Sequence, residues 1–257
     1  MTFDPLFDVS GRGALVTGAS SGLGEHFAKA LAARGAVVVA AARRADRLER
    51  LVETIRAAGG TAHAVSLDVT DAASVKAAVG RAQDLAGRLD IVVNNAGVAD
   101  THPSLTLPEE NWRRVLDTNL DGAWRVAQAS AQAMVAAGHG GSLVNIASVL
   151  GLRVANHLLA YSAAKAALIH LTQALALEWS RHGIRVNAIA PGYVETEINS
   201  GFFRSEAGQQ MVKRIPQRRI GTPRDLEGAL LLLASDAGAY MTGAVVVADG
   251  GHLVNSL

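Results

Sequence analysis

The chain has 257 residues, 49% of them hydrophobic and 18% charged, so it is long enough to bury a sizeable core within one domain. Its 24 Lys and Arg residues nearly balance 23 Asp and Glu residues, which leaves no strong positive field to attract nucleic acid or a membrane surface. Without cysteine, a membrane-length apolar stretch or a secretory signal pattern, we expect a cytoplasmic protein with no membrane or nucleic-acid partner.

Seven short apolar runs recur along the chain and predict strands. They lie at residues 14–17, 36–41, 62–67, 91–94, 142–146, 184–189 and 244–248. Between them, apolar residues at three- and four-residue spacing, such as Phe27 and Leu31, predict amphipathic helices. Because strands and helices alternate and the strands are almost entirely apolar, we predict a doubly wound, Rossmann-type α/β fold, with helices on both faces of a parallel sheet.

Residues 192–221 are the one long irregular stretch, and they include the small, polar and aromatic residues of GYVETEINSGFFRSEAGQQ. Loops of this length in compact domains are usually functional, so we predict a flap that covers the substrate. A surface insertion with one short helix is the alternative.

The first predicted strand runs into a glycine-rich turn that leads directly into a helical pattern. Glycines allow a tight turn and close approach of a ligand, and the N–H groups at a helix N-terminus favour a pyrophosphate. The residues expected to bind a dinucleotide here are Gly18, Ser20, Ser21, Gly22, Leu23 and Gly24. A tight turn without a ligand is one alternative. Another is the G-x-S-x-G elbow of serine hydrolases, although only one strand and no oxyanion-hole loop precede Ser20.

The end of the second predicted strand bears on the choice between NAD and NADP. NAD-binding proteins place a carboxylate there to accept from the ribose 2′-hydroxyl. Here the chain continues with Arg43 and Arg44, and the next carboxylate is Asp46. Because a guanidinium suits bidentate recognition of phosphate, we predict NADP(H), with Arg43 preferred over Arg44 as its partner. NAD(H) is the alternative cofactor, and two solvated arginines are the alternative without a ligand.

Tyr161 and Lys165 stand four residues apart in a strongly periodic helical pattern, so their side chains share one helix face. A phenol needs its pKa lowered by roughly three units to exchange protons near neutral pH, and one ammonium about 4 Å away is sufficient to do this. Ser148, at the carboxyl end of a predicted strand, is placed to donate to the charge that develops on a carbonyl oxygen. These three residues predict an enzyme that transfers a hydride between a nicotinamide and a carbonyl or alcohol.

Together these motifs resemble those of the short-chain dehydrogenase/reductase family over residues 8–251. The resemblance rests on TGASSGLG at 17–24, Asp68-Val69, Asn94-Asn95-Ala96-Gly97, Asn119, Ser148, Tyr161 with Lys165, Pro191-Gly192 and Thr196. It implies a seven-stranded sheet in the order 3-2-1-4-5-6-7 and one dinucleotide-binding and catalytic domain over 1–257. It also implies a homotetramer or homodimer, in which helices around 112–135 and 161–179 meet across one two-fold axis and residues 224–233 with the last strand meet across another.

The resemblance implies individual roles as well. Asp68 and Val69 would touch the adenine, and Asn95, Ala96 and Gly97 would line the cofactor. Asn119 would hold a water that links Lys165 to solvent for proton relay. Lys165 would also bind the nicotinamide ribose beside Tyr161, and Pro191, Gly192, Val194 and Thr196 would hold the nicotinamide.

The identity of the substrate is left open by these motifs. The segment ASVLGLRVANHLLAY lacks the G-N-x-G-Q typical of 3-oxoacyl-carrier-protein reductases, so reduction of 3-oxoacyl-[acyl-carrier-protein] or 3-oxoacyl-CoA is an alternative. A non-catalytic NADP(H)-binding sensor or scaffold is the alternative from another class. The eight histidines form no metal-ligand pattern, so we expect no metal site.

Overall fold

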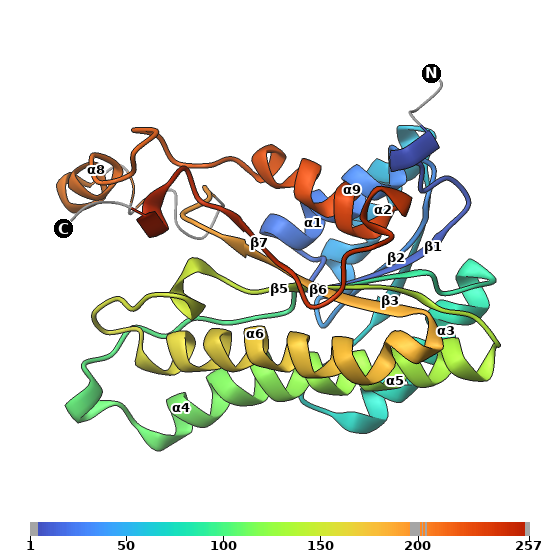
Figure 1. Ribbon diagram of the computed structural model, residues 1–257, viewed down its shortest axis with the longest axis horizontal. Coiled ribbons are helices and arrows are strands. Elements are labelled where there is room, and N and C mark those ends of the chain that lie inside the picture. Colours follow the sequence, from blue (N-terminus) through green and yellow to red (C-terminus); the bar gives the residue numbers. More distant parts are fainter. Residues whose placement is uncertain (1–4, 196–200, 202, 204, 255–257) are drawn as a thin grey trace.

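The computed structural model describes residues 5–195, 201, 203 and 205–254. Seven strands alternate with helices along these residues (Figure 1). The strands are β1 (Gly13–Thr17), β2 (Val37–Ala42), β3 (Thr61–Ser66), β4 (Ile91–Asn94), β5 (Gly141–Ile146), β6 (Ile184–Pro191) and β7 (Val245–Ala248). The α-helices are α1 (Gly22–Ala32), α2 (Ala45–Ala57), α3 (Ala72–Ala86), α4 (Glu109–Leu116), α5 (Gly122–Ala136), α6 (Leu159–Trp179), α8 (Glu206–Val212) and α9 (Glu227–Ala234).

All seven strands belong to one parallel sheet in the order β3-β2-β1-β4-β5-β6-β7. The predicted fold class and strand order are confirmed, and the predicted strand ends differ from the observed ones by at most two residues. The order reverses direction between β1 and β4, and at such a switch point open α/β sheets have a crevice outside the carboxyl ends of the strands. This is the place where open α/β sheets bind their ligands.

Helices cover both faces of the sheet, as Figure 1 shows. Phe27 and Leu31 of α1, Leu48 of α2 and Leu230 of α9 are buried on one face. On the other face, α3, α5 and α6 bury residues such as Met134. Since β1 and β5 are apolar and buried almost throughout, the sheet is a rigid platform for the loops at its two ends. None of the described helices has the length and apolar character needed to cross a membrane.

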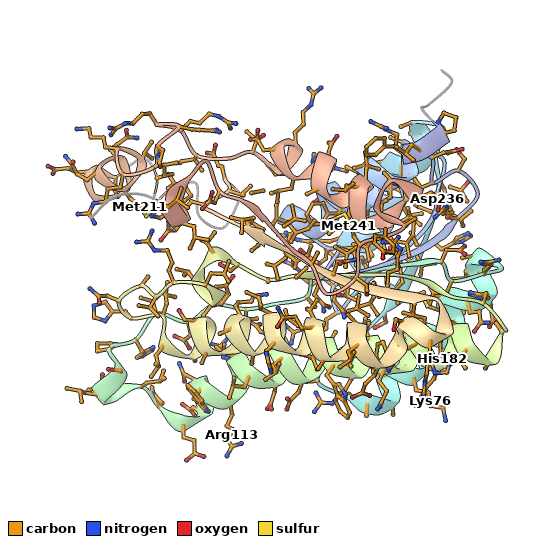
Figure 2. All side chains as sticks on the ribbon, in the orientation of Figure 1. Lys76, Arg113, His182, Met211, Asp236 and Met241 are labelled. Carbon is orange, nitrogen blue, oxygen red and sulfur yellow. The ribbon has the colours of Figure 1, made fainter. Side chains whose placement is uncertain are left out.

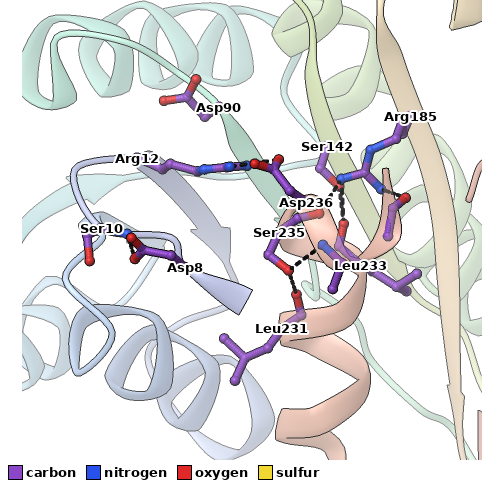
Figure 3. A network of polar contacts seen from close by, with 12 residues as sticks. Asp8, Ser10, Arg12, Asp90, Ser142, Arg185, Leu231, Leu233, Ser235 and Asp236 are labelled. Carbon is purple, nitrogen blue, oxygen red and sulfur yellow. Dashed lines mark hydrogen bonds and ion pairs between the residues drawn. The ribbon is translucent and has the colours of Figure 1, made fainter. Parts of the chain in front are cut away.

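The amino-terminal end of the sheet is held by a network of paired polar groups (Figure 3). Arg185 donates to the carbonyls of Leu233, Ser235 and Gly238 at 2.9, 3.1 and 2.8 Å, which satisfies acceptors at the end of α9. Ser142 Oγ donates to the Leu233 carbonyl at 2.6 Å. The network therefore ties β5 and β6 to α9.

The expected helix around residues 112–135 is divided into two helices by a π-helical turn, Asp117–Asp121. Gly122, directly after the turn, lies so close to Val69 that a Cβ at residue 122 would be 2.7 Å from Val69 Cγ2. Such turns inside α-helices are frequent at functional sites, because they free backbone groups and redirect side chains. The π-helical turn places Asn119 in the interior, where it is fully buried.

The predicted flap, 192–221, falls partly outside the described residues. Within it, β6 is followed by a short parallel bridge between Val194 and Gly221, and α8 is a short helix in the second half of the stretch. Figure 2 labels Met211 of α8 at one end of the molecule and Asp236, beside the network of Figure 3, at the other.

Candidate active site

The glycine turn between β1 and α1 has a backbone that only glycine adopts readily. Gly18 and Gly22 have φ values of 65° and 58°, in the left-handed region. A Cβ at Gly18 would lie 2.8 Å from Ala96 Cα, and one at Gly24 would lie 2.4 Å from the Gly18 carbonyl oxygen. The turn therefore packs directly against the loop after β4, and a side chain at either position would force the two apart.

The start of α1 fits a pyrophosphate. Ser21 occupies the N-cap position but makes no side-chain cap hydrogen bond, so its hydroxyl does not cap the N–H groups of the first turn. Leu23 packs against the hydrophobic core and so holds the glycine turn in place. Backbone donors and the positive end of the helix dipole thus face the crevice, which is the environment that an anionic phosphate requires.

Thr17 joins the loops after β1 and β4. Its Oγ1 accepts hydrogen bonds from the N–H groups of Asn95 and Ala96 at 3.0 and 3.1 Å. In return, Asn95 Nδ2 donates to the Thr17 carbonyl at 3.1 Å. Two of the predicted cofactor residues, Asn95 and Ala96, are therefore fixed against the glycine turn, and Gly97 lies beside Asn119.

The two arginines after β2 interact with different residues. Arg44 Nη2 donates to the hydroxyls of Ser20 and Ser21 at 2.8 and 2.7 Å, so its guanidinium lies on the glycine turn. Arg43 helps to lower the pKa of Asp68, after the larger effect of hydrogen bonds from Thr70. Whereas the sequence favours Arg43 as the phosphate partner, the structure brings Arg44 to the turn and Arg43 toward the predicted adenine residue.

Ser148 and Tyr161 come together at the carboxyl end of β5. Ser148 is 8% exposed, and its Oγ accepts from the Leu150 N–H at 3.1 Å, which fixes the side chain just beyond the strand. Burial raises the pKa of Tyr161, and the hydroxyl of Ser148 opposes this rise by favouring the phenolate. The serine hydroxyl and the phenol can therefore address the same substrate oxygen.

Lys165 is buried one helical turn after Tyr161, and its ammonium lies 5.6 Å from the centroid of the tyrosine ring. Its Nζ donates to the Ile146 carbonyl at 2.6 Å, and burial lowers the pKa of Lys165 to about 8. Burial is the largest influence on the pKa of Tyr161 and raises it, and the Lys165 ammonium is directed to the end of β5, so an effect of Lys165 on the phenol stays a prediction.

Asn119 uses its whole amide group to hold the loop after β4. Its Oδ1 accepts from the Val98 N–H at 2.7 Å, and its Nδ2 donates to the Val98 carbonyl at 2.8 Å. The side chain is thus engaged with Val98, and it is the π-helical turn around Asn119 that contacts α6. A water that serves Lys165 would have to use backbone groups of that turn instead of the side-chain amide.

The chain after β6 packs against the end of β7 on the far side of the crevice. The Gly192 N–H donates to the Ala248 carbonyl at 3.0 Å, and a Cβ at Gly192 would lie 2.7 Å from Asp249 Cα. Pro191 and Val194 are buried beside it, whereas Thr196 lies outside the described residues.

Three further residues meet at this end of the sheet without having been predicted. The ring of Tyr193 lies 5.2 Å from that of His252, and Arg153 Nη1 donates to the His252 carbonyl at 2.5 Å. Tyr193 stands between two residues that the resemblance marks, but no sequence pattern singles out Arg153 or His252. Only the fold brings the three together. Among the described residues, no group of three or more His, Cys, Asp and Glu side chains could hold a metal ion.

A glycine turn that fits a pyrophosphate and a Ser-Tyr-Lys set at the carboxyl edge of a doubly wound sheet are features expected of a dinucleotide-dependent oxidoreductase. A family model described as enoyl-(acyl carrier protein) reductase matches residues 18–252. The chain belongs to the short-chain dehydrogenase/reductase family. It is therefore a pyridine-nucleotide-dependent oxidoreductase of alcohol or carbonyl groups.

Similar proteins act on polyols and sugars. Galactitol 2-dehydrogenase (L-tagatose-forming) from Cereibacter sphaeroides is 40% identical over 257 residues, which are 99% of this chain and 100% of the relative. L-rhamnose 1-dehydrogenase (NAD(P)(+)) from Sphingomonas sp. is 39% identical over 96% of this chain and 98% of the relative. The structure of a gluconate 5-dehydrogenase from Burkholderia cenocepacia, in complex with NADP and tartrate, has a TM-score of 0.93 and 36% identity, covering 98% and 99% of the two chains.

Proposed function

We propose that this protein is an NADP(H)-dependent dehydrogenase that interconverts a secondary alcohol and a carbonyl group in a polyol or sugar-derived substrate. The observation that carries the proposal is that Ser148, Tyr161 and Lys165 meet just after β5, at the same carboxyl edge of the sheet at which the glycine turn follows β1. The polyol and sugar substrates named for similar proteins support the substrate class.

Each catalytic residue has one role in this proposal. The Tyr161 phenol gives a proton to the carbonyl oxygen during reduction and takes it back during oxidation. Ser148 donates a hydrogen bond to the same oxygen while charge develops on it. Lys165 supplies positive charge under Tyr161 and binds the nicotinamide ribose, and the turn around Asn119 connects Lys165 with water. The nicotinamide, when bound, supplies or accepts the hydride.

The cofactor residues are assigned in the same way. The N–H groups and hydroxyls of the glycine turn would hold the pyrophosphate, and Arg44 and Arg43 would flank the 2′-phosphate. The remaining contacts would come from Asp68 and Val69 at the adenine, from Asn95, Ala96 and Gly97 along the cofactor, and from Pro191, Gly192, Val194 and Thr196 at the nicotinamide. NADP(H) is favoured because β2 ends without a carboxylate, and NAD(H) is the alternative.

The proposed unit is a single domain over residues 1–257, with a substrate flap at 192–221, in a cytoplasmic homotetramer. Leu177 of α6 and Val135 of α5 are 82% and 44% exposed, although apolar side chains are usually covered. Tyr240 and Val247, beside and within β7, are exposed in the same way. Leu177 and Val135 lie within the ranges of the first interface implied by the family resemblance, and Val247 lies in the last strand of the second, which supports the proposed assembly.

A turnover screen tests the proposal. NADP+ reduction is followed with galactitol, D-threitol and D-gluconate, and NADPH oxidation with a 3-oxoacyl thioester and a steroid ketone. We expect turnover with the polyhydroxylated compounds and none with the thioester. Preference for the thioester would favour the 3-oxoacyl reductase alternative. Tight NADPH binding without turnover on the whole panel would instead favour a sensor or scaffold.

A further inference from the structure

Tyr193, His252 and Arg153 form a cluster that neither the acid/base chemistry nor the glycine turn requires. Tyr193 follows β6, His252 begins the short helix His252–Val254 near the C-terminus, and Arg153 follows the short helix Val149–Gly151 after β5. The Tyr193 and His252 rings lie 5.2 Å apart with an interplanar angle of 33°. Arg153 Nη1 donates to the His252 carbonyl, so three distant segments converge at one place.

The cluster adjoins the reacting phenol. Arg153 follows the helix Val149–Gly151, which Ser148 caps, and a Cβ at Gly151 would lie 2.7 Å from the Lys165 carbonyl oxygen. Tyr193 also adds to the effect of burial in raising the pKa of Tyr161. Arg153 in turn opposes the effect of burial on the pKa of Tyr193, and it adds to burial in lowering the pKa of His252. A substrate whose alcohol carbon is at Tyr161 would therefore extend toward Tyr193 and Arg153.

Several polar groups of the cluster have no hydrogen-bond or ion-pair partner among the described residues. His252 is 8% exposed, and its Nδ1 is buried without a hydrogen-bond partner. Within the described part of the chain, the Tyr193 hydroxyl has no hydrogen-bond partner and Arg153 forms no ion pair with a carboxylate. Buried polar groups are nearly always satisfied, so an orphan imidazole nitrogen beside an active site points to a ligand.

Arg153, Asp249 and Arg214 are the charged groups that act on His252. Asp249 is the carboxylate nearest in sequence to His252, and its two oxygens already accept from the N–H groups of Gly251 and Leu253 at 2.8 and 2.5 Å. Arg153 itself donates to a neutral carbonyl and forms no ion pair with a carboxylate of the described residues. A guanidinium in this state suits a carboxylate, which it can bind in bidentate fashion.

We propose that Arg153, Tyr193 and His252 form a substrate subsite for the carboxylate-bearing end of a polyhydroxy acid. Arg153 binds the carboxylate, and Tyr193 and His252 hold the hydroxyl groups between it and the reacting carbon. The inference rests on the proposed function and narrows its substrate class from polyols in general to sugar acids. A neutral polyol lacks the group that Arg153 recognises, so it binds more weakly.

Calorimetric titration of NADPH-saturated protein tests the subsite without turnover, because the reduced cofactor cannot accept a hydride from an alcohol. D-gluconate and galactitol are the probes, since both carry six carbons and several hydroxyls but only gluconate carries a carboxylate. We expect gluconate to bind at least tenfold more tightly than galactitol. In Arg153→Gln this preference is lost, and in Arg153→Lys it is partly restored, while galactitol affinity changes by less than about threefold in both.

The matched control is Arg181→Gln. Arg181 is another exposed arginine, but it follows the far end of α6, roughly 30 Å along the helix from Tyr161, and we expect no change there. Tyr193→Phe should weaken both probes, because it removes a hydroxyl contact and no charge. Equal affinity of the wild type for the two probes, binding of neither, or an unchanged preference in Arg153→Gln would overturn the subsite. Failure to bind NADPH would count against the proposed function instead, and fluorescence titration measures that separately.

Discussion

The two ends of the sheet carry polar residues of similar kinds in opposite states. At the amino-terminal end, Arg185 and Ser142 each donate to backbone carbonyls at the end of α9 (Figure 3). At the carboxyl end, Lys165 is a buried cation with a depressed pKa, and His252 Nδ1 has no partner. Burial lowers the pKa of Arg185 as well, but three carbonyls pair its guanidinium, whereas an unpaired buried nitrogen such as His252 Nδ1 points to a place where a ligand binds.

Residues at the amino-terminal end of the sheet hold the strands in place, whereas residues at the carboxyl end are positioned by the strands. Substitutions at the amino-terminal end should lower stability and leave catalysis intact. Substitutions at the carboxyl end should lower binding or catalysis and leave stability intact, or even raise it. Each prediction below tests one side of this division.

The largest effect is expected for Lys165→Met. Loss of the ammonium should reduce kcat/KM by about 10³-fold, within the range for an acid/base group. At pH 7 the variant should nevertheless be more stable by about 2 kcal/mol, because a buried cation is removed (about 3 kcal/mol) and one hydrogen bond is lost (about 1 kcal/mol). Urea unfolding and steady-state kinetics measure the two quantities.

The stability of the Lys165→Met variant also has a predicted pH dependence. Burial lowers the pKa of Lys165 from 10.5 to about 8 in the folded chain. Between these values the folded chain binds fewer protons than the unfolded chain, so the wild type gains stability as the pH rises. The advantage of the variant should therefore be full below pH 8 and shrink toward pH 10.5. An advantage that is constant with pH would contradict the buried charge.

Gly18→Ala should weaken NADPH binding by about 100-fold, because a Cβ there meets Ala96 Cα at 2.8 Å and shifts the turn by forcing φ away from 65°. Gly59→Ala is the matched control. Gly59 has a φ of 85°, but a Cβ at this position would meet no atom within 4 Å beyond its chain neighbours. The control should lose about 1 kcal/mol of stability and no NADPH affinity. Equal binding defects in the two variants would show that backbone strain alone is responsible.

Removal of an arginine after β2 should weaken the binding of NADPH by about tenfold. Arg44 contacts Ser20 and Ser21, so Arg44→Ala should weaken NADPH binding and leave NADH binding unchanged. Arg43→Ala should do the same if both guanidiniums reach the 2′-phosphate. Fluorescence titration with the two cofactors distinguishes them, and equal losses for NADPH and NADH would contradict phosphate recognition.

Arg185→Met tests the opposite end, and its expected effect on activity is the smallest. The guanidinium bonds to the carbonyls of Leu233, Ser235 and Gly238, which would be left without this donor. We expect a loss of about 3 kcal/mol in unfolding free energy with kcat/KM unchanged within twofold. A tenfold loss of kcat/KM in folded protein would show that the two ends are coupled.

The sequence was sufficient to predict the sheet and its strand order, and it also led to the proposed catalytic residues. Apolar strands can be recognised from their composition, and Tyr161 and Lys165 from their helical spacing, because both signals are local. The π-helical turn at Asn119 has no such signal, since it depends on the packing of Gly122 against Val69.

The direction of side chains was less predictable than the position of residues. Arg43 and Arg44 are neighbours in the sequence, and only the fold shows that Arg44 lies on the glycine turn. The pKa of Tyr161 depends on how deeply the phenol is buried, which a helix pattern does not reveal. Arg153 and His252 are about a hundred residues apart, so their contact arises from tertiary structure alone.

The central claim is that the carboxyl end performs the reaction and the amino-terminal end only supports it. Tyr161→Phe and Ser142→Ala, each the removal of one buried or half-buried hydroxyl, compare the two ends in one kinetic and unfolding experiment. We predict a loss of about 10³-fold in kcat/KM for Tyr161→Phe with wild-type stability. For Ser142→Ala we predict full activity with a loss of about 1 kcal/mol in stability. A Tyr161→Phe protein that kept the wild-type rate on an accepted substrate would contradict the account.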